Sequence, residues 1–180
     1  VRNNNKNIVK EIFKCEFFDS KRSNLIKAFI NSYSRDEPYM DIMYEIYEFD
    51  KNHEKLIDFN NLLPNGESFF TSIVIDRSNK SIDELVEFFL EKGVDPNKPN
   101  SRNVYPLEYA IRMSNISFVN ALVNSGKIDF NTKLTPKKSI KGFQLINKDE
   151  NYLHIAVRSD TPDILSIFLR NKFYDINSTD

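Results

Sequence analysis

The stretch that decides the fold is "SIDELVEFFLEKGVDPN", residues 81–97. Its apolar residues recur at i, i+3, i+4, i+7 and i+8, which predicts one buried face of a helix: Ile82, Leu85, Val86, Phe89 and Leu90. Ser81 and Glu84 form a capping box at the start of this helix. Gly93 is predicted to end it, because glycine adopts the left-handed conformation found at helix ends without a Cβ clash.

The same pattern returns twice along the chain, at "FVNALVNSGKIDFN" (118–131) and "ILSIFLRNKFYDIN" (164–177). Gly126 follows Gly93 by 33 residues, and the third helix is predicted to begin with Thr161 as N-cap and Pro162 at its first position. The expected apolar faces of these two helices are Ile116, Val119, Leu122 and Val123, then Ile164, Leu165, Phe168 and Leu169. Each unit closes on the same polar pair: Asp95/Asn97, Asp129/Asn131 and Asp175/Asn177. A period near 33 residues predicts a repeat protein.

A second motif precedes each of these helices, in "GESFFTSIV" (66–74), "NVYPLEYAI" (103–111) and "ENYLHIAV" (150–157). The motif T-P-L-H-x-A with a 33-residue period is typical of ankyrin repeats. The matching residues are Pro106, Leu107 and Ala110, then Leu153, His154 and Ala156, with Phe69, Phe70 and Ile73 at the same positions of a degenerate unit. The chain therefore resembles the ankyrin repeat family over residues 62–180. This resemblance implies an all-α solenoid of stacked helix–turn–helix units.

The spacing of the motifs divides the chain further. Phe70 to Leu107 is 37 residues and Leu107 to Leu153 is 46, so extra residues are expected near 77–80 and within 132–148. The repeats are placed at about 62–98, 99–131 and 146–180. Residues 1–61 are expected to be helical, as an N-terminal cap, decayed repeats or both. Short helices are predicted within 7–18, 23–33, 38–49 and 54–63, and the favoured arrangement is a decayed repeat at 38–63 after a capping helix pair.

Composition and motifs exclude several kinds of chemistry. The 180 residues carry a net charge of −1, and no apolar run approaches the ~18 residues of a membrane span. Cys15 is the only cysteine, so an internal disulfide is excluded, and this residue is interpreted as a buried apolar side chain. We expect no catalysis, no metal and no cofactor, because no nucleophile motif, phosphate-binding glycine loop or metal-ligand spacing occurs. His154 matches the histidine of the ankyrin motif, which implies a structural hydrogen bond in the turn.

The resemblance also implies a function. Ankyrin repeats bind partner proteins on the concave surface made by the finger tips and the first helices. The positions carried over are Asn65, Glu67, Ser101, Arg102, Val104, Tyr105, Arg112, Met113, Lys148, Glu150, Arg158 and Ser159. They are expected to be free for binding because the core of the repeat does not use them. Arg102 and Arg112 are the foremost candidates, since arginine is frequent at binding hot spots. Tyr105 is either an exposed anchor or packs on the neighbouring finger.

Two alternatives remain open from the sequence. The chain could be a regulatory or targeting domain of a larger enzyme. It could also bind a polyanion through the basic insert at 132–148, which holds Lys133, Lys137, Lys138, Lys141 and Lys148 and no acid, although a solvated loop explains the same lysines. Nucleic acid is the weaker form of this hypothesis, because no arginine and no stacking aromatic apart from Phe143 accompanies the lysines. We expect a monomer without membrane contact, in the cytoplasm of its own cell or, for a delivered effector, of a host cell.

Overall fold

The computed structural model describes residues 40–52, 57–74, 82–135 and 150–171. Within these residues it contains helices and no strand. The helices are α3 (Met40–Asn52), α4 (Phe69–Val74), α5 (Ile82–Glu91), α6 (Pro106–Arg112), α7 (Ile116–Asn124), α8 (Tyr152–Val157) and α9 (Pro162–Asn171). The all-α prediction is therefore confirmed.

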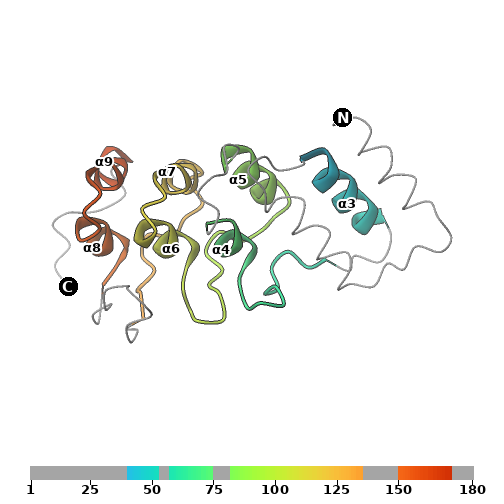
Figure 1. The fold of residues 1–180 in the computed structure, drawn as a ribbon, viewed down its shortest axis with the longest axis horizontal. Coiled ribbons are helices and arrows are strands. Elements are labelled where there is room, and N and C mark those ends of the chain that lie inside the picture. The colour runs from blue at the N-terminus through green and yellow to red at the C-terminus, as the bar shows by residue number, and fades with distance from the viewer. Residues whose placement is uncertain (1–39, 53–56, 75–81, 136–149, 172–180) are drawn as a thin grey trace.

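The helices form two layers that run the length of the molecule (Figure 1). The short helices α4, α6 and α8 stack on one another in what we call the inner layer. The longer helices α5, α7 and α9 stack in the same order in the outer layer, which α3 extends. Each inner helix is preceded by a projecting segment, here called a finger: finger 1 is 57–68, finger 2 is 94–105 and finger 3 is 128–135. This is the solenoid that the repeated sequence predicts.

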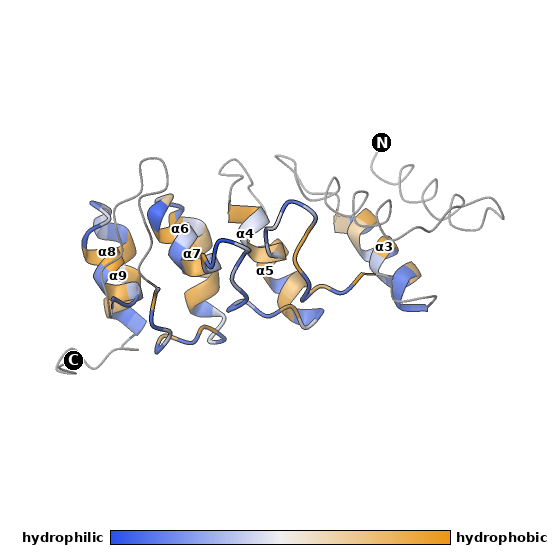
Figure 2. Ribbon diagram, turned by 90° about the horizontal axis from the view of Figure 1, so that it is seen from below, coloured by the Kyte–Doolittle hydropathy of each residue, from blue (hydrophilic) through white to orange (hydrophobic). Residues whose placement is uncertain are grey.

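The core lies between the two layers. Figure 2 shows hydrophobic stretches on helices of both layers, and the largest buried side chains include Phe69, Phe70, Phe88, Phe89 and Phe118. Their rings meet edge to face or tilted across unit boundaries, as Phe70 and Phe118 do with 6.5 Å between centroids. Aromatic contacts in such geometry add to the free energy gained by burial.

Most of the predicted apolar faces are buried, but Leu90 and Leu165 are only partly so and two residues are exposed. Ile116 is 38% exposed and Leu169 is 52% exposed, while Phe88, Phe118 and Ile167 are buried although the pattern did not include them. The buried arc is wider than one stripe because an outer helix packs on its inner partner and on its neighbours in the same layer. Leu169 aligns with Val123, which is fully buried in a layer where α7 packs against α9. Among the described helices none follows α9.

The glycines that follow α5 and α7 have the predicted role. Gly93 and Gly126 have φ of +77° and +65°. The Val94 N–H donates to the Phe89 carbonyl at 2.9 Å, and the Gly93 N–H donates to Leu90 at 3.3 Å, which together form a Schellman motif. Pro162 begins α9, as predicted. Thr161 directly precedes the helix, and its hydroxyl donates to the Ser159 carbonyl at 3.0 Å.

The N-terminal prediction is partly wrong. No helix occupies residues 57–63, where the second helix of a decayed repeat was expected. These residues form a turn and the start of finger 1, and Ile57 and Phe59 bury their side chains there. Helix α3 lies beside α5 in the outer layer, where its Tyr44 ring packs edge-on against Phe88 at 4.8 Å. Helix α3 therefore occupies the position of the second, outer-layer helix of a repeat, and not that of the first, inner-layer helix.

The basic insert also begins later than predicted. Residues 132–135 belong to finger 3, since Leu134 is 1% exposed and its N–H donates to the Glu150 carbonyl at 2.9 Å. Several predictions lie outside the described residues: the helices before residue 38, Cys15, the cap at Ser81, the extra residues at 77–80, the insert from 136 to 148 with Lys148, and the turn at Asp175 and Asn177.

Candidate interaction surface

Helices α4 and α8 of the inner layer begin with the same reciprocal cap. The side chain of Thr71 accepts from the Ser68 N–H at 2.8 Å, and Ser68 Oγ accepts from the Thr71 N–H at 3.2 Å. At the start of α8, His154 Nδ1 accepts from the Asn151 N–H at 3.1 Å, and Asn151 Oδ1 accepts from the His154 N–H at 3.2 Å. The structural role predicted for His154 is confirmed, because its acceptor nitrogen satisfies a backbone donor at the helix start.

The fingers are joined to one another by hydrogen bonds. The Ser101 N–H in finger 2 donates to the Gly66 carbonyl in finger 1 at 2.8 Å. The Asn103 side-chain amide donates to Thr135 Oγ1 in finger 3 at 2.9 Å. Within finger 2, Asn100 Oδ1 accepts from the Arg102 and Val104 N–H groups, each at 3.0 Å. These bonds fix the finger tips relative to the helices that they precede.

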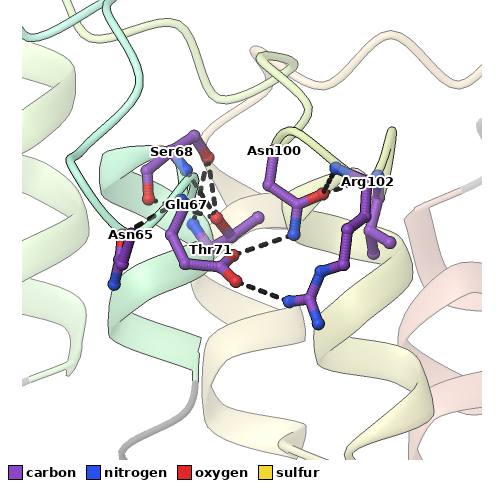
Figure 3. A network of polar contacts seen from close by, with 7 residues as sticks. Asn65, Glu67, Ser68, Thr71, Asn100 and Arg102 are labelled. Atoms are coloured by element: carbon purple, nitrogen blue, oxygen red, sulfur yellow. Dashed lines mark hydrogen bonds and ion pairs between the residues drawn. The ribbon is translucent and has the colours of Figure 1, made fainter. Parts of the chain in front are cut away.

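A buried carboxylate connects fingers 1 and 2 (Figure 3). Glu67 is 6% exposed. Its Oε2 accepts from Asn100 Nδ2 at 2.8 Å, and its Oε1 pairs with Arg102 Nη2 at 2.5 Å. Its own N–H donates to Asn65 Oδ1 at 3.1 Å. Glu67 thus has hydrogen-bonded partners for the charge that it buries, as a buried carboxylate requires.

Similar pairs recur in the next two units. Arg112 Nε lies 3.1 Å from Glu108 Oε1, and Arg158 Nη2 lies 2.5 Å from Glu150 Oε2. In every pair the arginine side chain is the more exposed partner: 50% against 9% for Arg102 and Glu67, 33% against 12% for Arg158 and Glu150, and 12% against 1% for Arg112 and Glu108. A guanidinium therefore lies over a carboxylate in each unit.

Comparison with known families identifies this architecture. A family model of ankyrin repeats, in three copies, matches residues 73–180, which is more than half of the chain. The chain belongs to the ankyrin repeat family. No curated protein matches it significantly. Ankyrin repeats generally mediate protein–protein interaction. The finger tips and inner helices are together called the inner face below.

The candidate residues on this ankyrin surface differ in accessibility. Asn65, Ser101 and Arg102 are exposed at finger tips. Tyr105, Arg112, Met113, Arg158 and Ser159 are partly buried. Tyr105 precedes α6, is partly buried and packs on the core. Its packing on the neighbouring finger stays a prediction.

The expectation that the core leaves all these positions free is wrong for three of them. Val104 is 8% exposed, Glu67 is 6% exposed and Glu150 is 9% exposed. Val104 is a buried apolar side chain, whereas Glu67 and Glu150 pair with arginines. Arg112 is also a poorer contact than predicted, because only 12% of its side chain is exposed above Glu108.

Sequence reasoning named Glu67 and Glu150 as contact residues but missed that both are buried and paired with arginines. Glu67 and Glu150 each stand one residue before the cap of an inner helix, at the position that Val104 holds in the middle unit. An acid in two units, at a position that is apolar in the third, was the signal in the sequence that could have revealed these buried carboxylates. Their arginine partners could not be inferred from it, because Arg102 lies 35 residues after Glu67 but Arg158 only 8 after Glu150.

Other kinds of site find little support in the part of the chain that the structure describes. No group of three His, Cys, Asp or Glu residues there could hold a metal. None of the described helices is long and apolar enough to cross a membrane. An open cleft of about 460 Å³ lies between α5 and α7 in the outer layer, away from the candidate residues.

Proposed function

We propose that this chain is a protein–protein interaction module that binds its partner on the inner face and performs no catalysis. The observation that carries the proposal is Arg102, a half-exposed guanidinium at a finger tip held by a buried acid. Arginine is among the residues that most often dominate binding energy at interfaces. The family's general role in protein interaction supports the same conclusion.

The rigidity of the surface supports binding as well. Fingers 1 and 2 share the Ser101–Gly66 hydrogen bond, and fingers 2 and 3 share the Asn103–Thr135 hydrogen bond. A surface already fixed before association loses little conformational entropy when the partner docks. The Arg102 side chain should lose the least conformational entropy on binding, because its Glu67 partner already restricts its rotamers.

The candidate residues then divide into two groups. Those that would contact the partner are Asn65, Ser101, Arg102, Tyr105, Met113, Arg158 and Ser159. Those that would support them from below are Glu67, Val104, Arg112 and Glu150. Lys148, outside the described residues, stays a candidate on sequence grounds alone.

Site-specific photocrosslinking tests the proposal. A benzophenone amino acid placed at Lys133, exposed in finger 3, is compared with the same amino acid at Asn120, exposed on α7 in the outer layer. We expect one defined protein to be captured in cells from position 133 and not from position 120. Capture from position 120 alone, or equal capture from both positions, would contradict binding on the inner face.

A further inference from the structure

The net charge of −1 conceals a separation of charge between the two faces. In the described segments 61–74, 98–113, 131–135 and 150–159, which build the inner face, the only acids are Glu67, Glu108 and Glu150, and all three are buried. The cations of the same segments reach solvent: Lys98, Arg102 and Lys133 are exposed, and Arg112 and Arg158 partly so.

The remaining acids of the fingers lie elsewhere. Asp58, Asp95 and Asp129 stand where the chain leaves the outer layer. Each accepts a hydrogen bond from a backbone N–H two residues later, at 2.9, 2.8 and 3.0 Å respectively. They cap the turns and do not belong to the finger tips.

The part of the outer layer that α3 and α5 build carries the opposite charge. Helices α3 and α5 expose six acids: Asp41, Glu48, Asp83, Glu84, Glu87 and Glu91. The ammonium of Lys92 lies over the rings of Tyr44 and Tyr47, 4.9 and 4.6 Å from their centroids, and 4.0 Å from Glu91 Oε2. Lys51 lies 3.9 Å from Glu48 Oε2, so these two cations offset only part of the six acids. Burial, and then the neighbouring Glu91, Glu87 and Glu84, raise the pKa of Tyr44 above its usual 10.0, which agrees with a negative field here.

We propose that the inner face binds an acidic segment of a partner protein, whose Asp or Glu carboxylates pair with Arg102 and Arg158. This inference rests on the proposed function and adds the chemistry of the partner. A guanidinium has five N–H donors, and within the described residues one nitrogen of each of these arginines pairs with its glutamate. The outer N–H groups remain for a second carboxylate, which a guanidinium binds with two parallel hydrogen bonds.

The charge distribution favours a carboxylate partner over nucleic acid. Binding to a phosphate backbone depends on how many phosphates the protein neutralises. The described inner face offers few cations, so it could neutralise few phosphates. The acidic outer layer would also repel a long polyanion, whereas a short acidic segment can lie along the inner face alone.

Selection from a displayed library of random twelve-residue peptides tests the inference. We expect the selected peptides to be enriched in Asp and Glu and to bind more weakly as salt rises. Arg102→Gln should lower the affinity of a selected peptide about tenfold. Arg170→Gln removes the same charge from an exposed position on α9 in the outer layer and should change the affinity less than about twofold.

Two further arms keep the outcomes distinct. Lys133→Gln, at an exposed finger position, should weaken binding of the selected peptide about twofold. It replaces Arg102→Gln as the test variant if thermal melts show that Arg102→Gln is unfolded. A fifteen-residue oligothymidylate should bind more weakly than the selected peptide. Tighter binding of the oligonucleotide would overturn the inference in favour of nucleic acid.

The failure of the inference differs from the failure of the proposed function. Selected peptides that are neutral or basic, yet lose affinity in Arg102→Gln, would overturn the acidic partner and leave binding on the inner face standing. Peptides whose binding responds to Arg170→Gln but not to Arg102→Gln or Lys133→Gln would overturn both. A library that yields no peptide would also count against both.

Discussion

Gly66 and Gly93 both have positive φ, but their surroundings differ. At Gly93 an added Cβ would meet nothing within 4 Å, whereas at Gly66 it would lie 2.4 Å from Ser101 Oγ. Glycine is therefore favoured at residue 93 by backbone conformation alone, and at residue 66 by conformation together with the approach of finger 2.

The first prediction separates these two causes. Gly93→Ala should lower the free energy of unfolding by about 1 kcal/mol, the cost of a left-handed alanine. Gly66→Ala should lower the free energy of unfolding by more, because the added methyl group would lie 2.4 Å from Ser101 Oγ. Ser101→Ala removes that oxygen and should recover only part of the excess loss, since the Ser101 Cβ still lies 3.1 Å from the methyl group. Urea denaturation of the three single variants and the Gly66→Ala/Ser101→Ala pair measures the coupling. Equal losses for the two glycine variants would contradict the clash.

At Ser114 we predict that introducing a glycine stabilises the protein. It follows α6 with φ of +52°, although it has a side chain. Its N–H donates to the Ile111 carbonyl at 3.0 Å, and the next N–H donates to Ala110 at 3.0 Å, the hydrogen-bond pattern seen after α5. Ser114→Gly should therefore raise the free energy of unfolding by about 0.5–1 kcal/mol, because glycine adopts this conformation without strain. Thermal melts check this, and a lowered Tm would show that the Ser114 hydroxyl matters more than the backbone.

At the scale of helices, Lys92 joins α3 to α5. Its ammonium lies 4.6 Å from the centroid of the Tyr47 ring and 5.5 Å from that of Phe88, while its side chain is 16% exposed. Cation–π contacts of this kind contribute about 0.5–2 kcal/mol. The contact therefore stabilises the packing of α3 on the repeat that follows.

Removing the charge should loosen α3 selectively. Lys92→Met keeps most of the side-chain volume and should increase amide hydrogen exchange in α3 about tenfold, with little change in α7. Lys51→Met, which removes a cation exposed on α3 itself, is the matched control and should leave this exchange unchanged. Faster exchange in all helices of the Lys92 variant would show a global rather than a local role.

The elements that could be predicted from the sequence are those set by local chemistry. The period of Leu85, Val86 and Phe89 and the glycine after them predict helix α5, its buried face and its end. The apolar residues of 57–63 misled the same reasoning, because Ile57, Phe59 and Leu63 bury in a turn and finger. The identity of "IDFN" at 57–60 with "IDFN" at 128–131 was the better guide.

The candidate surface could be predicted only in part, for a physical reason. A repeat motif indicates which positions lie on the inner face, and Arg102 is exposed there. Whether such a position is covered depends on tertiary neighbours, as Glu67 beneath Arg102 and Glu108 beneath Arg112 show. The separation of charge between the faces likewise depends on which acids fold inward.

At the scale of the whole molecule, side-chain amides link successive units. Asn60 Nδ2 donates to the Gly93 carbonyl at 3.1 Å, and Asn60 Oδ1 accepts from the Asp95 N–H at 2.8 Å. Asn97 repeats both bonds one unit later, with Lys127 at 2.9 Å and Asp129 at 2.9 Å. Stability in a solenoid depends on such contacts between neighbouring units.

Breaking one link should reduce cooperativity as well as stability. Asn97→Ala removes both bonds and should cost about 1–2 kcal/mol, with a broader urea transition because the units on either side unfold more independently. Lys98→Ala, at the exposed neighbouring residue, is the control and should leave the transition unchanged. An unchanged midpoint and slope for Asn97→Ala would show that apolar packing alone couples the units.

The central claim is that the inner face is where a partner binds. Hydrogen–deuterium exchange of the chain, with and without the tightest peptide from the library, tests it most directly. We predict slower exchange in finger 2 and helix α6, around Arg102, and no change in α5. Protection confined to α5 and α7, where the open cleft of the outer layer lies, would contradict the claim.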